Sequence, residues 1–232
     1  MGGRVIAVLR SAFGETNDPL AASVNDLIEK AIDVMKAAGA SIVDIAIPNL
    51  EYYVEFTSLY MTHSRHDIDA FLGARPEMPM KKLKDIVESG KFHPAIELLP
   101  ELAQGPEVPT AQADYYERYT ARETFQRIII NQMAKVGARA VVFPTTNIPS
   151  PTRVDLDAGK WGTFTFPTNT LIAAQSWMPA ISVPAGFTTQ GLPVGMEILG
   201  LPYREADLLS LAYAFEQATN HRRPSAILPE LV

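Results

Sequence analysis

Two aspartates in a proline-rich stretch are the first residues whose type and spacing suggest chemistry. Asp155 and Asp157 stand two residues apart, and Lys160 follows closely. Two carboxylates can divide general acid and general base roles when their surroundings separate their pKa values. The alternative is a turn whose carboxylates are solvated, and the sequence leaves both interpretations open.

A pair of histidines is the second candidate. His63 and His66 lie three residues apart, with Asp67 and Asp69 beside them. One face of a helix could therefore offer two imidazoles and a carboxylate to a metal ion. No further ligand motif follows in the sequence. The favoured interpretation is a solvated polar helix face, and we predict neither a metal site nor a cofactor.

Other chemistries lack the residues that they need. The absence of cysteine excludes thiolate nucleophiles, disulfides and zinc–thiolate sites. Neither the Gly-x-Ser-x-Gly elbow of α/β-hydrolases nor the Gly-Lys-Ser/Thr triplet of a phosphate-binding loop occurs. Only Gly14 lies between Leu9 and Pro19, where a dinucleotide fingerprint needs three spaced glycines.

Composition and charge narrow the class of protein and its partners. The 232 residues are 47% hydrophobic and 20% charged, which is enough apolar material for a packed core. A net charge of −6 argues against nucleic acid or an anionic membrane as partner, because both need a basic face. No apolar run is long enough to span a bilayer, and the N-terminus lacks the pattern of a signal peptide. We therefore expect a cytoplasmic globular protein.

The elements that must position these residues begin with a strand–helix–strand pattern. Residues 5–9 are an apolar, β-branched run typical of a strand. Asp18 can cap a helix whose first turn holds Pro19, and Gly39 can end it. A second strand is predicted at 42–47. Such a unit places its two strands in parallel.

The rest of the chain predicts more helices and three further strands. The pattern predicts helical segments at 50–71 and 80–87, a connector at 90–109, a long helix from about 110 to Gly137, and a strand at 140–143. A long loop from Pro144 to Pro167 follows, then a short helix near 169–176. Two strands at 180–184 and 194–199 are separated by a turn at Gly191, and a helix closes the chain. The fold class is therefore α/β, a mostly parallel mixed sheet flanked by helices, in one domain over 1–232.

Four motifs in the last third occur in a recognisable order. They are Phe-Pro-Thr-Thr at 143–146, Phe-Pro-Thr-Asn at 166–169, Met-Pro-Ala-Ile-Ser-Val-Pro-Ala-Gly-Phe-Thr at 178–188, and Gly-Leu-Pro-Val-Gly-Met-Glu-Ile-Leu-Gly at 191–200. In this order and spacing the chain resembles the C-terminal half of the amidase signature family of amide hydrolases. Its opening at 4–9 and the helix start at 18–19 also resemble the preceding segment of that family. The resemblance is weak between about 50 and 112.

The same resemblance implies a catalytic apparatus that this chain lacks. Members of the family use a nucleophilic serine, a second bridging serine and a lysine base, which belong to the N-terminal half. This chain has no Ser-Ser pair, and its only Gly-Gly is Gly2-Gly3. No lysine here matches the catalytic position, so we assign no catalytic residue. The glycine-rich segment that forms the oxyanion hole is missing too.

The resemblance therefore implies the substrate-side C-terminal part of a hydrolase of carboxylic amide C–N bonds, inactive by itself. Whether the chain alone is an enzyme stays open. In a complete member, the segment after the third strand walls the substrate cleft, which makes Thr145, Thr146, Trp161 and Phe164 the candidates for substrate contact. Half of a shared sheet should leave an open edge, so we expect self-association or association with an N-terminal half. A small-molecule amide is the expected substrate.

Two alternatives remain at this stage. One is a non-catalytic binding or assembly module built on the same half-fold. The other is a complete enzyme of a different kind that uses Asp155, Asp157 or the pair His63 and His66. The sequence does not name the amide.

Overall fold

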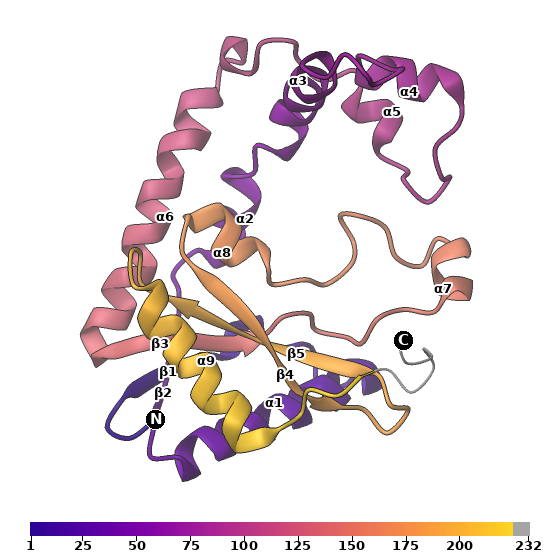
Figure 1. Cartoon of the computed structure of the whole chain (residues 1–232). Helices are drawn as coiled ribbons and strands as arrows, with labels where there is room; N and C mark the ends of the chain where they lie inside the picture. Colours follow the sequence, from indigo (N-terminus) through magenta and orange to yellow (C-terminus); the bar gives the residue numbers. More distant parts are fainter. Residues whose placement is uncertain (225–232) are drawn as a thin grey trace. The chain divides into compact units, whose positions relative to one another are not determined.

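The computed structural model describes residues 1–224, so residues 225–232 of the predicted domain lie outside the described part. It holds one five-stranded sheet (Figure 1). The strand order is β2-β1-β3-β5-β4. The strands are β1 (Val5–Leu9), β2 (Ser41–Ile45), β3 (Ala138–Pro144), β4 (Ala180–Phe187) and β5 (Pro193–Gly200).

Helical segments connect these strands along the chain, except for β4 and β5, which follow each other directly. The α-helices are α1 (Pro19–Ala37), α2 (Leu50–Phe56), α3 (Tyr60–Gly73), α4 (Leu83–Ser89), α5 (Leu99–Leu102), α6 (Tyr115–Val136), α7 (Arg153–Asp157), α8 (Leu171–Ser176) and α9 (Glu205–Thr219). Two short 3₁₀ helices are η1 (Arg10–Ala12) and η2 (Pro109–Ala111). In the part of the chain that the structure describes, no helix is both long and apolar enough to cross a bilayer.

The predicted fold class is confirmed. β1 pairs in parallel with both β2 and β3, β5 runs antiparallel to β3, and β4 runs antiparallel to β5. Four strands therefore point one way and β5 points the other. The predicted βαβ unit and the predicted C-terminal hairpin are both present, with Gly191 in the turn at a φ of 80°.

The predicted start and end of the first helix, α1, are confirmed. Asp18 accepts a hydrogen bond from the backbone N–H of Leu20 at 2.9 Å, and Pro19 occupies the first turn of α1. Gly39 follows the helix at a φ of 88°, a left-handed conformation that favours glycine. The apolar stripe of α1 is buried against the sheet, as its 3.6-residue spacing predicts.

Three details of the predicted elements were wrong. The helical stretch predicted at 50–71 is two helices, α2 and α3, which are separated by residues 57–59. In this break the buried hydroxyl of Thr57 donates to the carbonyl oxygen of Tyr53 at 2.6 Å. The connector predicted at 90–109 contains the helix α5. The long loop predicted between Pro144 and Pro167 contains α7.

The chain divides into two compact units. The first comprises residues 1–48, 126–150 and 167 onward; the second comprises 49–125 and 151–166. The single domain predicted over 1–232 stays a prediction, because two compact units can still fold as one domain.

The first unit contains the sheet and its main core. Helices α1 and α9 pack on the same face of the sheet and contact each other (Figure 1). Side chains alternate along a strand, so every second residue of β3 and β5 enters this core. Its fully buried members include Ile28 and Met35 of α1, Met196 and Ile198 of β5, and Phe215 of α9.

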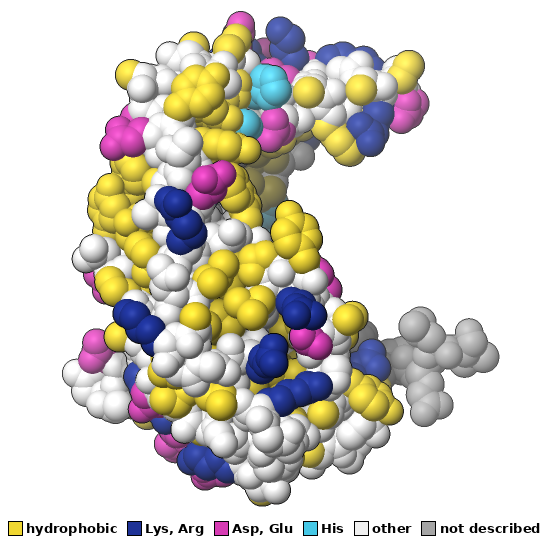
Figure 2. Space-filling view, turned by 90° about the vertical axis from the view of Figure 1, so that its left-hand side faces the viewer, with side chains coloured by type: hydrophobic (Ala, Val, Ile, Leu, Met, Phe, Trp, Pro, Cys, Tyr) yellow, Lys and Arg dark blue, Asp and Glu magenta, His cyan; other side chains and the backbone are white. Residues whose placement is uncertain are grey.

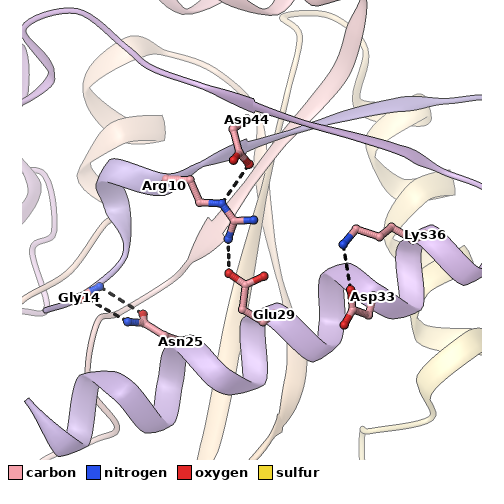
Figure 3. Close-up of polar contacts among 7 residues, drawn as sticks. All are labelled: Arg10, Gly14, Asn25, Glu29, Asp33, Lys36 and Asp44. Carbon is pink, nitrogen blue, oxygen red and sulfur yellow. Dashed lines mark hydrogen bonds and ion pairs between the residues drawn. The ribbon is translucent and has the colours of Figure 1, made fainter. Parts of the chain in front are cut away.

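A network of polar side chains lies beside β2, the strand at one edge of the sheet. Arg10 donates to Asp44 of β2 at 3.0 Å and also pairs with Glu29 of α1 (Figure 3). Asn25 of α1 exchanges two hydrogen bonds with the backbone of Gly14, at 3.3 and 2.9 Å. These contacts attach the segment after β1 to α1, and the ion pairs place charge on the β2 edge.

The second unit is helical, and contacts between α6 and α2 stabilise it. Arg118 and Arg122 of α6 donate to the carbonyl oxygens of Phe56 and Thr57 at the end of α2. Tyr53 stacks on Phe125 with ring centroids 5.3 Å apart. These contacts hold α2 beside the N-terminal part of α6.

Candidate functional site

Three polar side chains gather on the face of the sheet opposite α1 and α9. Ser182 of β4 and Glu197 of β5 are register partners. The residue after β3, Thr145, donates its backbone N–H to the carbonyl oxygen of Gly195 at 3.0 Å. Its hydroxyl oxygen lies 2.6 Å from that of Ser182, so the two hydroxyls are hydrogen-bonded. The neighbouring strands β4 and β5 and the segment that follows β3 thus contribute one residue each.

Gly195 makes this approach possible. A Cβ atom at Gly195 would lie 2.8 Å from Oγ of Ser182 and 2.9 Å from Oγ1 of Thr145. Any side chain there would separate the two hydroxyls. The motif in β5 therefore needs glycine for close packing.

Glu197 is the unusual member of the cluster. Its side chain is buried, with 4% of the residue exposed, and no ion pair to it occurs among residues 1–224. Burial raises the pKa of its carboxyl from 4.5 to about 7, because the charged form loses its hydration. Near neutral pH this group is part neutral acid, which donates a hydrogen bond, and part carboxylate, which accepts one.

An open depression lies against this cluster, between α8 and the strands β4 and β5. Its volume is about 420 Å³. Trp177 at the end of α8 has a φ of 53°, a left-handed conformation that is uncommon for a bulky residue. Ser182 and Glu197 of the cluster line the depression together with mostly apolar residues of α8, its flanks and β4. The lining residues are Thr170, Ala173, Ala174, Trp177, Met178, Ala180, Ile181, Ser182 and Glu197.

Asn169 holds the loop that leaves β3. Its side-chain nitrogen lies 2.7 to 2.8 Å from three oxygens, the carbonyls of Ala12 and Pro144 and the side chain of Asn147, which share its two N–H donors. Its backbone N–H donates to the carbonyl oxygen of Thr145 at 3.0 Å. One side chain therefore joins the segments that follow β1 and β3 to the start of α8.

We expect Asn169→Ala to lower the free energy of unfolding by about 1–3 kcal/mol, since it leaves partly buried acceptors without their donor. Urea denaturation of the wild type and the variant measures this. The matched control is Asn17→Ala in an exposed turn, which should change stability by less than about 0.5 kcal/mol. Equal effects at the two positions would contradict the role given to Asn169.

The structure places the four predicted substrate contacts in different units. Thr145 joins the polar cluster, and the neighbouring Thr146 donates to the carbonyl oxygen of Ile148 at 2.8 Å and bridges to Thr168, all in the first unit. Trp161 and Phe164 belong to the second unit.

In that second unit, Trp161 packs edge-on against Phe166, with ring centroids 6.1 Å apart. Phe164 is 65% exposed. Whether Thr145, Thr146, Trp161 and Phe164 contact one substrate stays a prediction.

Asp155 has a structural task. Thr152 caps α7 by accepting from the backbone N–H of Asp155 at 3.1 Å, and its hydroxyl donates to the Asp155 carboxylate at 2.9 Å. This hydrogen bond, with Lys160 at 3.6 Å, lowers the pKa of Asp155. A carboxylate that stays ionised in this way is unsuited to the role of general acid.

The histidine pair gathers around a single carboxylate on α3. Nδ1 of His66 lies 2.8 Å and Nδ1 of His63 3.5 Å from the two oxygens of Asp67. The hydrogen bond from His66 is the main cause of the lowered pKa of Asp67. These three residues could hold a divalent cation, and Figure 2 shows histidine side chains beside acidic ones at the surface. The contacts of both histidines with Asp67 account for the arrangement without a metal.

Sequence reasoning missed Glu197, Ser182 and Asn169 as members of a site, although all three lie in the quoted motifs. A signal was present for the first. Glu197 is the only charged residue in the otherwise apolar strand β5, and alternation places it on the face opposite Met196 and Ile198. Its proximity to Ser182 and Thr145 depended on the strand register.

Comparison with known proteins identifies the family to which this fold belongs. The family model described as Amidase matches residues 2–209. The chain therefore belongs to the amidase family, and the resemblance drawn from the motifs is confirmed.

Individual relatives agree with this assignment. A glutamyl-tRNA(Gln) amidotransferase subunit from Bartonella bacilliformis is 29% identical over 215 residues, covering 86% of this chain and 42% of the relative. The peptide amidase from Stenotrophomonas maltophilia has a TM-score of 0.71 at 26% identity, covering 96% of this chain and 44% of that structure. A peptide amidase bound to chymostatin has a TM-score of 0.74 at 25% identity, covering 96% and 45%. The chain spans less than half the length of the relatives that it matches.

Proposed function

We propose that this chain is the substrate-side C-terminal part of an amidase-family hydrolase of carboxylic amide C–N bonds. In this proposal the nucleophilic serine, the bridging serine and the lysine base belong to a segment outside these 232 residues. The observation that carries it is the family match over residues 2–209 in a chain that spans less than half of its relatives.

The chemistry of the described residues supports this division of labour. Amide hydrolysis needs an activated nucleophile next to a proton shuttle. Ser182 is hydrogen-bonded to Thr145, and neither hydroxyl has a basic nitrogen partner among residues 1–224. The cluster suits binding and orientation of a substrate or a neighbouring segment.

The substrate-contacting residues of the proposal are Thr145, Thr146, Trp161 and Phe164. The loop that carries them leaves the carboxyl end of β3, where ligands bind in open α/β sheets. The threonine hydroxyls offer hydrogen bonds to the amide group, and the aromatic rings offer apolar contact to the acyl or amine part.

A chimera tests the proposal. The part of Stenotrophomonas maltophilia peptide amidase that this chain does not match is joined ahead of residue 2, and release of ammonia from a peptide amide is measured. We expect activity from the chimera and none from the 232-residue chain. A Ser→Ala change at the nucleophile of the joined segment is the matched control and should abolish the activity.

Two results would contradict the proposal. One is amide hydrolysis by the chain alone that is lost on mutation of one of its own residues. The other is a chimera that folds but has no activity, together with a ligand that stabilises the isolated chain. That result would favour the alternative, a binding or assembly module. A cytoplasmic location and self-association stay predictions.

A further inference from the structure

Two imidazoles and a carboxylate meet on one face of α3, in the second unit. His63, His66 and Asp67 each offer one ligand atom, and these atoms all lie within 4.8 Å of one another. Among the residues that the structure describes, no other three histidine or acidic side chains are gathered in this way. The spacing of the two histidines by itself did not favour a metal site, so the argument for one depends on what surrounds them.

The helix brings the three ligand atoms together. Side chains three and four residues apart lie on the same face of an α-helix, so His63 has both His66 and Asp67 beside it. The two imidazole rings stand edge to face, with centroids 6.4 Å apart. Asp67 contacts each ring on its Nδ1 side, at 2.8 Å for His66 and 3.5 Å for His63. An ion that replaces the shared protons would therefore find its donors already close together.

Tyr115 of α6 fixes the imidazole of His63 from its other side. The hydroxyl of Tyr115 lies 3.2 Å from Nε2 of His63. In the same turn of α3, the hydroxyl of Thr62 donates to the side-chain oxygen of Gln112 at 3.1 Å. A metal-binding histidine almost always has a hydrogen-bond partner at its second nitrogen, which sets the tautomer and the ring orientation. When Nε2 holds the proton and donates it to Tyr115, the lone pair of Nδ1 faces Asp67.

The cationic neighbour in this turn is paired elsewhere. Arg65 stands between the two histidines in the sequence, and its guanidinium contacts Glu107 at 2.5 Å and Asp69 at 3.9 Å. It also donates to the carbonyl oxygen of Gly105 at 2.8 Å. Since its charge is not paired with Asp67, that carboxylate remains available to a second cation. His66 and Asp67 are exposed, so an ion can reach them from solvent without opening of the fold.

We propose that His63, His66 and Asp67 bind a divalent transition-metal ion of the Zn²⁺ class, with Tyr115 as a positioning residue behind His63. Two imidazole nitrogens and one carboxylate oxygen suit Zn²⁺, whereas Mg²⁺ and Ca²⁺ prefer oxygen ligands alone. Three protein ligands leave a coordination position for water or for an exogenous ligand. The site shares no residue with the polar cluster on the sheet, so its test is independent of the proposed function.

Metal titration of the 232-residue chain, without a histidine tag, tests the proposal. Zn²⁺ is added in competition with a chromophoric chelator, and we expect saturation at one ion per chain. Co²⁺ should bind at the same site and give the visible absorption of a four-coordinate ion, and Mg²⁺ at the same concentration should not displace it. Bound Zn²⁺ should also raise the unfolding temperature, because the unfolded chain does not hold the three ligands together.

Four variants locate the site. His66→Ala and Asp67→Asn each remove one ligand and should weaken Zn²⁺ binding at least about tenfold. Tyr115→Phe keeps the ring and removes the hydroxyl, so it should weaken binding by about tenfold and change the Co²⁺ spectrum. Its unfolding temperature with a chelator present should stay close to that of the wild type. His93→Ala, the matched control, removes an exposed histidine of the same unit and should bind Zn²⁺ like the wild type.

The contrary results are equally specific. Absence of saturable Zn²⁺ binding to the wild-type chain would overturn the proposal. Equal losses in His66→Ala and His93→Ala would show that Zn²⁺ binds surface histidines without a common site. Unchanged affinity in Asp67→Asn would remove the carboxylate from the ligand set and contradict the three-ligand site. Unchanged affinity and Co²⁺ spectrum in Tyr115→Phe would contradict the positioning role of Tyr115.

Discussion

Phe215→Ala should lower the free energy of unfolding by about 3–5 kcal/mol. Phe215 lies on α9 and is fully buried in the core shared by α1, α9 and the sheet. Loss of its ring removes apolar contacts. It also leaves a cavity between α9 and the sheet, because the other core side chains keep these two layers apart. Urea denaturation followed by circular dichroism measures the change.

The control for this prediction lies on the same helix. Tyr213 is 63% exposed, so Tyr213→Ala removes an aromatic ring of similar size from the surface of α9. The change in helix propensity is similar to that of Phe215→Ala. Tyr213→Ala should cost less than about 0.5 kcal/mol. Similar losses for Phe215 and Tyr213 would mean that α9 does not pack on the sheet as described.

Glu197→Gln should stabilise the chain by about 3 kcal/mol above pH 7 and leave its stability near pH 4 almost unchanged. Burial raises the pKa of Glu197 to about 7 in the folded chain, against 4.5 for the free side chain. Between these values the unfolded chain has lost the proton and the folded chain still holds it. The wild type therefore loses stability as the pH rises from about 4.5 to 7, and glutamine removes this loss.

Denaturant midpoints of the two proteins across this pH range test the prediction. The difference between the curves should open between pH 4.5 and 7 and stay constant above it. Glu15→Gln, which removes a carboxyl from an exposed loop, should give a curve parallel to the wild type. Parallel curves for Glu197→Gln as well would show that the Glu197 carboxyl is solvated in the chain.

The amino-acid sequence by itself determined the local elements and the family. Asp18 and Pro19 start α1, and short apolar runs mark β1 and β5, because capping and the local side-chain pattern depend on neighbours a few residues away. The motifs between 143 and 200 identified the amidase family by their order and spacing.

Tertiary structure decided the strand order and the members of the polar cluster. Thr145, Ser182 and Glu197 are well separated along the chain, and only the register of β3, β5 and β4 brings them to one face. The sequence pattern placed Glu197 inside a strand but could not show that its neighbour is Ser182 at an uncharged edge. Pairing across strands depends on the packing of the whole sheet, because a one-residue slip in register turns every side chain to the opposite face.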